Sequence, residues 1–364
     1  MLVKKLESNK MKYIVLLFVV WVGFTSCETV TKKYGAKGLM VTGKTGEILV
    51  VCDKSLWDSE IHELLDSNLT QFIMPYYPDV ATFELIHRTP AKFTDAIKRY
   101  RNTLVITIDR NFQGKQVSVE KKYHVWAHDQ LLIEITAKDY NQLVDFCKNG
   151  MPGVHDAFDY YDWKRILNQF KSNNNGVITT PIEKNFGISL KLPEGTKNVW
   201  KRDNFYRLEF PSGSKPIEFA GTGTQDPGTI FSGLLIYQYD FKDSSQFRLE
   251  QLLKDRDTML RYNVPHQVED MYMGTQYQKE IFPMLISTKN ASGKISGFDM
   301  RGMFQFQHRT LKGTGGAFWA FHFIHPKRKK IICISGYVDA PSTTSWTHSL
   351  REVQAVIRSV ELID

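Results

Sequence analysis

The sequence predicts a protein of the α+β or α/β class with two domains, a mixed sheet with helices in the first and a largely antiparallel sheet with packed helices in the second. Three observations point to this. The chain has 364 residues, 42% of them hydrophobic, which is more than the usual 100–200 or so residues of one domain. Strand and helix patterns alternate in the first half, whereas strand patterns dominate the second. A polar, turn-forming run, Ser172–Gly176, separates the two halves.

In the first half, apolar strands alternate with amphipathic helices. Glu47–Cys52 is almost continuously apolar, as a buried strand is. Behind it, Leu56, Ile61 and Leu65 recur at helical spacing. A strand, helix, strand order implies an at least partly parallel sheet. The other expected elements are strands at 82–87, 103–109, 123–126 and 131–136, and helices at 94–101, at 140–148 and up to about 170.

The second half contains many strand patterns and closes with a helix. Apolar and β-branched runs predict strands near 188–192, 206–210, 234–239, 282–287, 302–309, 317–324 and 331–336. A helix at 245–261 interrupts them. The C-terminal helix is marked by an apolar stripe of Trp346, Leu350, Val353, Ile357 and Val360. We therefore expect an antiparallel sheet with helices packed on it.

The N-terminus has the pattern of an export signal. Tyr13–Cys27 is a run of 15 residues without a charge, and it follows a lysine-bearing leader. A bilayer core needs about 20 helical residues, so the run is typical of a secretory signal and too short for a membrane span. We predict localisation to the cell envelope.

Cys27 is the predicted site of lipid attachment. Phe24-Thr25-Ser26-Cys27 puts a small residue directly before a cysteine and resembles a bacterial lipobox, in which the cysteine is acylated and becomes the new N-terminus. Several acyl chains, at about 0.8 kcal/mol per buried methylene, give a stable anchor on the periplasmic face or the outer membrane. The alternative is an ordinary signal peptide with a chance cysteine. The predicted organisation is a lipoprotein signal peptide at 1–26, a spacer at 27–45, an N-terminal α/β domain at 46–171, a linker at 172–180 and a C-terminal α+β domain at 181–364.

The charge gives no indication of nucleic-acid binding. The formal net charge is +8, but residues 1–26 contribute +3, so the remaining 338 residues carry only +5. Nucleic-acid-binding domains carry a stronger and more clustered basic excess. We therefore expect a partner of another class, namely the membrane through the lipid anchor and an envelope protein or glycan.

One motif match is expected to be false. Gly38–Thr45 satisfies the G-x-x-x-x-G-K-[ST] pattern of a phosphate-binding P-loop. That mechanism needs a strand before the loop and a helix after it, so that helix N-terminal amides face the phosphates. Here the spacer precedes the loop and a strand follows it. The sequence therefore predicts no nucleotide cofactor.

The histidines and cysteines suggest no metal site and no cofactor. His124 and His128 would lie roughly 13 Å apart on an extended strand, too far for one ion. His322 and His325, three residues apart, would point to opposite faces of a strand. Cys52 and Cys333 lie in apolar runs and are expected to be buried; whether Cys147 pairs with either stays open.

The strongest candidate for a binding site is an acidic run. His155, Asp156, Asp159 and Asp162 fall on one predicted helix, and the three aspartates are spaced by three residues along one side of it. Carboxylates beside aromatic rings suit a divalent metal or a sugar. The alternative is the charged face of an amphipathic helix, with Lys164 and Arg165 as partners.

Several motifs resemble a family of uncharacterised lipoproteins from Bacteroidetes. The similarity spans nearly the whole chain after Cys27 and is carried by Gly46–Val51, Trp57, Arg101–Val105, Gly315–Phe318, Gly336–Pro341 and Leu350–Ala355. The family is described only as a domain of unknown function, so the resemblance implies no catalytic residue. Phe186–Pro193 also looks like the opening strand of PsbP-like domains, which implies an α/β/α sandwich for the second half.

The sequence thus predicts a membrane-anchored envelope lipoprotein that serves as a non-catalytic binding or structural module. No catalytic residue is predicted. The alternative is an envelope hydrolase acting on glycan or peptide, whose Asp and His residues come together only in the folded chain. A deep pocket lined by several of His128, His155, Asp156, Asp159 and Asp162 would favour that alternative.

Overall fold

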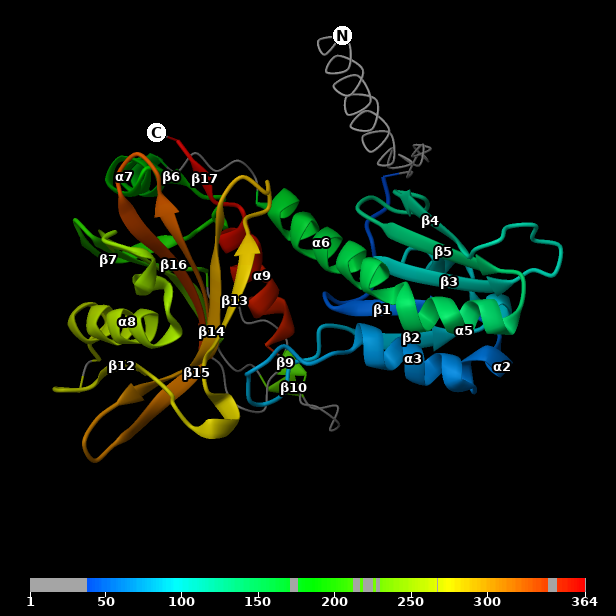
Figure 1. Ribbon diagram of the computed structural model, residues 1–364, viewed down its shortest axis with the longest axis horizontal. Coiled ribbons are helices and arrows are strands. Elements are labelled where there is room, and N and C mark those ends of the chain that lie inside the picture. Colours follow the sequence, from blue (N-terminus) through cyan, green and yellow to red (C-terminus); the bar gives the residue numbers. More distant parts are fainter. Residues whose placement is uncertain are drawn as a thin grey trace, which may run out of the picture.

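The computed structural model contains two large sheets, one in each half of the chain, with helix α6 (Met151–Gln169) lying between them (Figure 1). The structure describes residues 38–170, 176–211, 217–218, 225–226, 230–266, 268–339 and 346–363. Cys27, the predicted signal peptide 1–26 and most of the predicted spacer lie outside these residues. The two predicted sheet types are both confirmed.

The sheet of the first half is mixed. Its strand order is β2-β1-β3-β5-β4, with β1 parallel to β2 and β3, β3 parallel to β5, and β4 antiparallel to β5. All five residues of β1 are buried, which accounts for its apolar sequence. The bounds are β1 Glu47–Val51, β2 Glu84–Arg88, β3 Asn102–Ile108, β4 Ser118–Tyr123 and β5 Leu131–Ala137.

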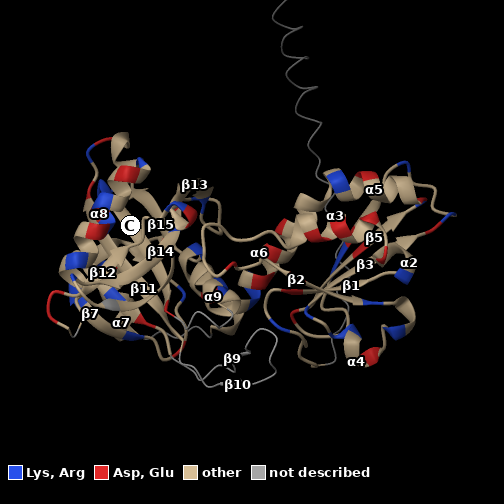
Figure 2. Cartoon of the chain, turned by 90° about the horizontal axis from the view of Figure 1, so that it is seen from below, with Lys and Arg blue, Asp and Glu red and all other residues tan. Residues whose placement is uncertain are grey.

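One face of this sheet is covered by helices α3, α5 and α6. Their apolar residues, among them Ile61, Leu143 and Phe158, form one core with Ile48 and Leu104 of the strands. The short helix α4 lies on the other side of the sheet (Figure 2). The helices before α6 are α2 Lys54–Trp57, α3 Glu60–Leu69, η1 Pro90–Lys92, α4 Asp95–Lys98 and α5 Tyr140–Asn149.

The main sheet of the second half is antiparallel, in the order β12-β14-β15-β16-β11-β8-β7, with β13 also paired to β14. Its long central strands pair without a register shift over ten residues in β11–β16 and in β15–β16. The bounds are β7 Lys197–Arg202, β8 Phe205–Glu209, β11 Phe231–Asp240, β12 Tyr272–Thr275, β13 Met284–Lys289, β14 Ser296–Gln307, β15 Lys312–His325 and β16 Lys330–Asp339.

Helices cover both faces of this sheet and make it a sandwich. Alternate residues of β11 point to opposite faces: Leu234 and Ile236 pack in the core beside α9 (Thr347–Arg358), whereas Leu235 and Tyr237 pack beside α8 (Leu249–Asn263). Gly336 of β16 lets α9 approach closely, because a Cβ there would lie 1.8 Å from the Val353 side chain. The remaining elements are α7 Gly176–Phe186, β6 Ile188–Ser189, β9 Ile217–Glu218, β10 Gln225–Asp226, η2 Ser244–Phe247, η3 Lys279–Ile281 and β17 Glu361–Leu362.

The segment expected to be a linker, 172–180, is partly helical. Residues 176–180 begin α7, whose Ile178, Ile182 and Phe186 recur every four residues and are buried in the core beside α9. Burial of this face explains why the chain is helical so soon after a polar run. Residues 171–175 lie outside the described part.

In the described part of the chain, no helix is long and apolar enough to cross a membrane. Cys52, Cys147 and Cys333 are buried free thiols, and burial raises the pKa of each to about 12. They are therefore inert packing residues under ordinary conditions.

Candidate functional site

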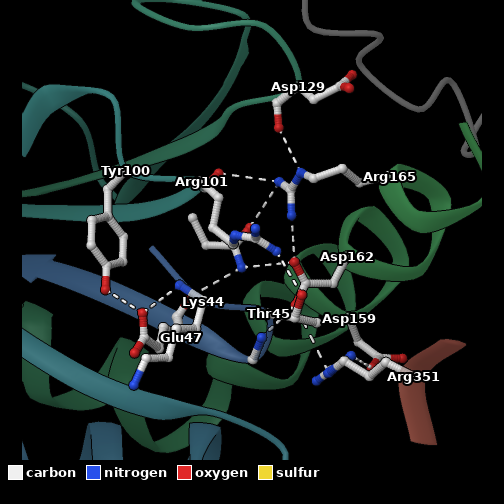
Figure 3. Close-up of polar contacts among 12 residues, drawn as sticks. Lys44, Thr45, Glu47, Tyr100, Arg101, Asp129, Asp159, Asp162, Arg165 and Arg351 are labelled. Carbon is white, nitrogen blue, oxygen red and sulfur yellow. Dashed lines mark hydrogen bonds and ion pairs between the residues drawn. The ribbon is translucent and has the colours of Figure 1, made fainter. Parts of the chain in front are cut away.

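Helix α6 carries the four residues singled out by the sequence, and two of them, Asp159 and Asp162, lie beside Arg351 of α9 (Figure 3). Their exposures differ sharply. The side chain of Asp162 is fully buried and that of Asp159 is 25% exposed, whereas Asp156 is 82% exposed. The acidic run is therefore divided between the protein interior and the solvent.

Asp162 is the centre of a buried charge cluster. Its carboxylate accepts hydrogen bonds from the Gly46 amide at 3.0 Å and from the Asn102 side chain at 3.1 Å, and it pairs with Arg165 one turn along α6. Burial alone would raise the pKa of Asp162, but three nearby guanidinium groups outweigh burial and hold it below the ordinary value. They belong to Arg351, Arg165 and Arg101.

Arg351 reaches this cluster from the other half of the chain. It lies on α9, is fully buried, and donates to the Asp159 carboxylate at 2.8 Å and to the Thr82 carbonyl at 2.6 Å. Its guanidinium also stacks over the Phe83 ring, 4.7 Å from the ring centre. Arg351, from the second half of the chain, thus supplies a positive charge that balances the aspartates of the first half.

The segment that matches the P-loop pattern also ends in this cluster. The Lys44 amide donates to the Glu47 carboxylate at 2.6 Å, just as the Gly46 amide donates to Asp162. The hydroxyl of Thr45 accepts from Arg101 at 2.8 Å. Strand β1 follows directly, as predicted. The amides that would face a phosphate are therefore turned toward carboxylates of the protein itself.

Apolar contacts surround the charges and extend the junction between the halves. Trp163, Ile166 and Leu167 of α6 pack against Ala355 of α9. Further along, the buried Tyr76 donates its hydroxyl to the Phe318 carbonyl of the second sheet at 3.1 Å. The two halves therefore pack against each other, and buried charges from both halves pair at the junction.

The predicted binding residues separate into two pairs. Asp162 is fully buried and engaged by arginines, so its oxygens are not open to a metal or a sugar, whereas Asp159 pairs with Arg351 through one oxygen and stays 25% exposed. His155 and Asp156 form a second pair at 3.2 Å, with the His155 ring edge-on to Phe83. Arg351 is not predicted from the sequence. The one signal for it there is an arginine next to the apolar stripe of the C-terminal helix.

The expected geometry of His124 and His128 is wrong. Strand β4 ends at Tyr123, and the chain turns because His124 and Asp129 adopt left-handed backbone conformations, with φ of 53° and 61°. The two imidazole rings consequently lie 5.0 Å apart, far closer than the separation expected on a strand. The spacing argument failed because the segment is a loop.

The other histidine pair lies on strand β15. His322 is fully buried, and desolvation together with the positive charge of Arg256 lowers the pKa of His322 to about 3. His325, at the end of the strand, is also buried and contacts the Gly187 carbonyl at 3.2 Å. Both are structural residues of the core.

Comparison with known proteins gives a family match in each half of the chain. Residues 175–359, just over half of the chain, match a domain of unknown function (DUF4837). The chain belongs to the DUF4837 family. Residues 41–171 match a second domain of unknown function (DUF8532). No curated protein matches the sequence.

Two solved structures share a distant likeness with this family member. The Ran-binding protein Mog1p of Saccharomyces cerevisiae has 9% identity and a TM-score of 0.30, over 49% of this chain and 91% of its own. LpqN of Mycobacterium tuberculosis, described as involved in cell envelope biogenesis, has 12% identity and a TM-score of 0.26, over 47% and 79%. Likeness at this level carries no argument about function.

The charge cluster predicts a large difference between two chemically identical substitutions on α6. Asp162→Asn leaves buried guanidinium groups without their carboxylate and should lower the free energy of unfolding by about 3–5 kcal/mol. Asp156→Asn, at an exposed site, should change it by less than about 0.5 kcal/mol. Urea unfolding followed by circular dichroism measures both. Equal effects of the two substitutions would contradict the role given to Asp162.

The buried His322 predicts a specific loss of stability in acid. Between pH 6.5 and 3, the unfolded chain binds a proton at His322 that the folded chain does not, so stability falls as the pH falls. Between pH 6 and 4, the unfolding free energy of the wild type should therefore fall more steeply than that of His322→Leu. The two slopes should differ by up to about 1.4 kcal/mol per pH unit. The exposed His266→Leu should keep the wild-type slope. Parallel slopes for the wild type and His322→Leu would refute the assignment.

Proposed function

We propose that this protein is a lipid-anchored component of the cell envelope that acts as a non-catalytic binding or structural module. The proposal of an anchor rests on the lysine-bearing leader, the charge-free run Tyr13–Cys27 and the small residue before Cys27. In this proposal Cys27 carries the lipid, and the partner is a protein or glycan of the envelope.

The proposed anchor would hold the folded part close to the membrane. The described chain begins at Gly38, eleven residues after Cys27, and even a fully extended chain of this length spans only about 40 Å. Thr42 already contacts the folded core, since its amide donates to the Arg99 carbonyl at 3.0 Å. A partner would therefore be met near the membrane surface.

The observation that favours a binding or structural role over hydrolysis is the state of two carboxylates of α6, Asp159 and Asp162. A hydrolase needs an acid or base that can reach the substrate. Asp159 and Asp162 instead hold Arg351 and Arg165 between the halves. Their geometry supports a rigid body that presents a fixed surface.

The distribution of charge supports a partner other than nucleic acid. Lysine and arginine residues are interspersed with aspartate and glutamate over both halves of the chain (Figure 2). Nucleic-acid-binding proteins gather their basic residues on one face or along one helix. A protein or glycan surface suits a mixed charge pattern better.

The anchor is tested by metabolic labelling with palmitate. The wild type should incorporate the label and partition into the detergent phase, and Cys27→Ser should lose both properties. Cys147→Ala, which removes a buried thiol, should keep them. Label that persists in Cys27→Ser would show that Cys27 is not the attachment site.

The binding role is tested by affinity capture of the anchored wild-type protein from detergent-solubilised envelopes. A stoichiometric partner that is recovered reproducibly, and that a column carrying no protein does not retain, is the expected result. The same preparation should not cleave envelope glycan or peptide. Turnover of either substrate without a captured partner would favour an envelope hydrolase instead.

A further inference from the structure

The loop between β4 and β5 brings together three side chains with metal-binding chemistry. His124, His128 and Asp129 each place one potential ligand atom within 4.8 Å of the others. We propose that these three residues bind a divalent transition-metal ion of the zinc class. The inference is independent of the anchor and of the binding role proposed above.

The ligand set selects the class of metal. Two imidazoles and one carboxylate suit Zn²⁺, Ni²⁺ or Cu²⁺, whereas Mg²⁺ and Ca²⁺ prefer oxygen ligands alone. In a tetrahedral zinc site, bonds of 2.0–2.1 Å place the ligand atoms roughly 3.3 Å from one another. The cluster must therefore contract, and His128, whose side chain is 63% exposed, has the freedom to move inward.

The backbone of the loop is already held in the conformation that the site needs. The His124 amide donates to the Gln130 carbonyl at 3.0 Å and closes the loop. From outside, the Leu39 carbonyl accepts the His128 amide at 2.7 Å, and Arg165 donates to the Asp129 carbonyl at 2.7 Å. Metal binding therefore needs side-chain movement and little ordering of the chain.

Exposure leaves room for further ligands. His128 lies at the surface, while the Asp129 side chain is 18% exposed. Three protein ligands with solvent on one side is the pattern of sites in which water or another molecule completes the coordination. The proposed site is therefore open, and it differs in this from a closed structural zinc site with four protein ligands.

Two features set a limit on the affinity. The Nδ1 atom of His124 accepts the Asp129 amide at 2.9 Å, so an ion bound at Nδ1, in contrast to one bound at Nε2, must displace this hydrogen bond. Helix α6 also presents two cations to the loop, Lys164 and Arg165. Arg165 is neutralised by Asp162, but the exposed Lys164 repels the ion. We therefore expect micromolar binding.

The test is calorimetric titration of ZnCl₂ into the full chain in detergent. The wild type should bind one ion at this site, and His128→Gln and Asp129→Asn should weaken binding at least tenfold. His266→Gln, which removes an exposed histidine elsewhere, should bind as the wild type does. MgCl₂ and CaCl₂ should give no saturable signal.

A second variant separates a metal site from a merely structural loop. Lys164→Gln keeps all three ligands and removes an exposed cation that acts on His124, so zinc binding should tighten several-fold. Unfolding midpoints without metal should be unchanged for His128→Gln and Lys164→Gln, because both side chains are exposed. Absence of zinc binding by the wild type, or equal binding by His128→Gln, would overturn the proposal.

Discussion

A fully buried carboxylate must be neutralised where it lies, and this requirement at Asp162 determines how the two halves of the protein meet. Removing one ion from water costs several kcal/mol, and the cost is recovered only when partners with good geometry surround it. The partners of Asp162 come from α6, from the turn before β1, from the start of β3 and from α9. Four segments far apart in the sequence are thus fixed against one another by one charge.

Arg165 extends this constraint beyond the junction. Its guanidinium pairs with Asp162 on one side and donates to the Asp129 carbonyl on the other, so the loop that holds His124 and His128 depends on the same residue. The charge cluster and the histidine loop are therefore mechanically linked. A change in the junction between the halves would alter the spacing of the proposed metal ligands.

The sequence predicts the central strands well because their burial requires apolar runs, as in β1, β11 and β16. It does not predict β7, an edge strand of mostly exposed polar and charged residues. It also does not predict α7, because Pro181 and the asparagines before the helix are typical of a break in secondary structure. Edge strands and short helices are set by tertiary packing, which leaves a weak local pattern.

The candidate site could be predicted only in part, for a similar reason. Asp162 and Arg165 are three residues apart on one helix, and their pairing follows from that spacing. Arg351 is far away in the sequence, and no local rule connects it to Asp159. The approach of His124 to His128 depends on two non-glycine residues with positive φ, a conformation that His and Asp adopt more often than most residues but still only rarely.

The position of Arg351 near the end of the chain also sets an order of events during synthesis. Residues 47–169 contain every strand of the first sheet and all of α6, but Asp162 lacks one of its three guanidinium neighbours until residue 351 has been added. A nascent or truncated chain therefore carries a first half whose charges are not yet balanced. The buried carboxylate therefore gains its full set of guanidinium neighbours only once α9 has been synthesised.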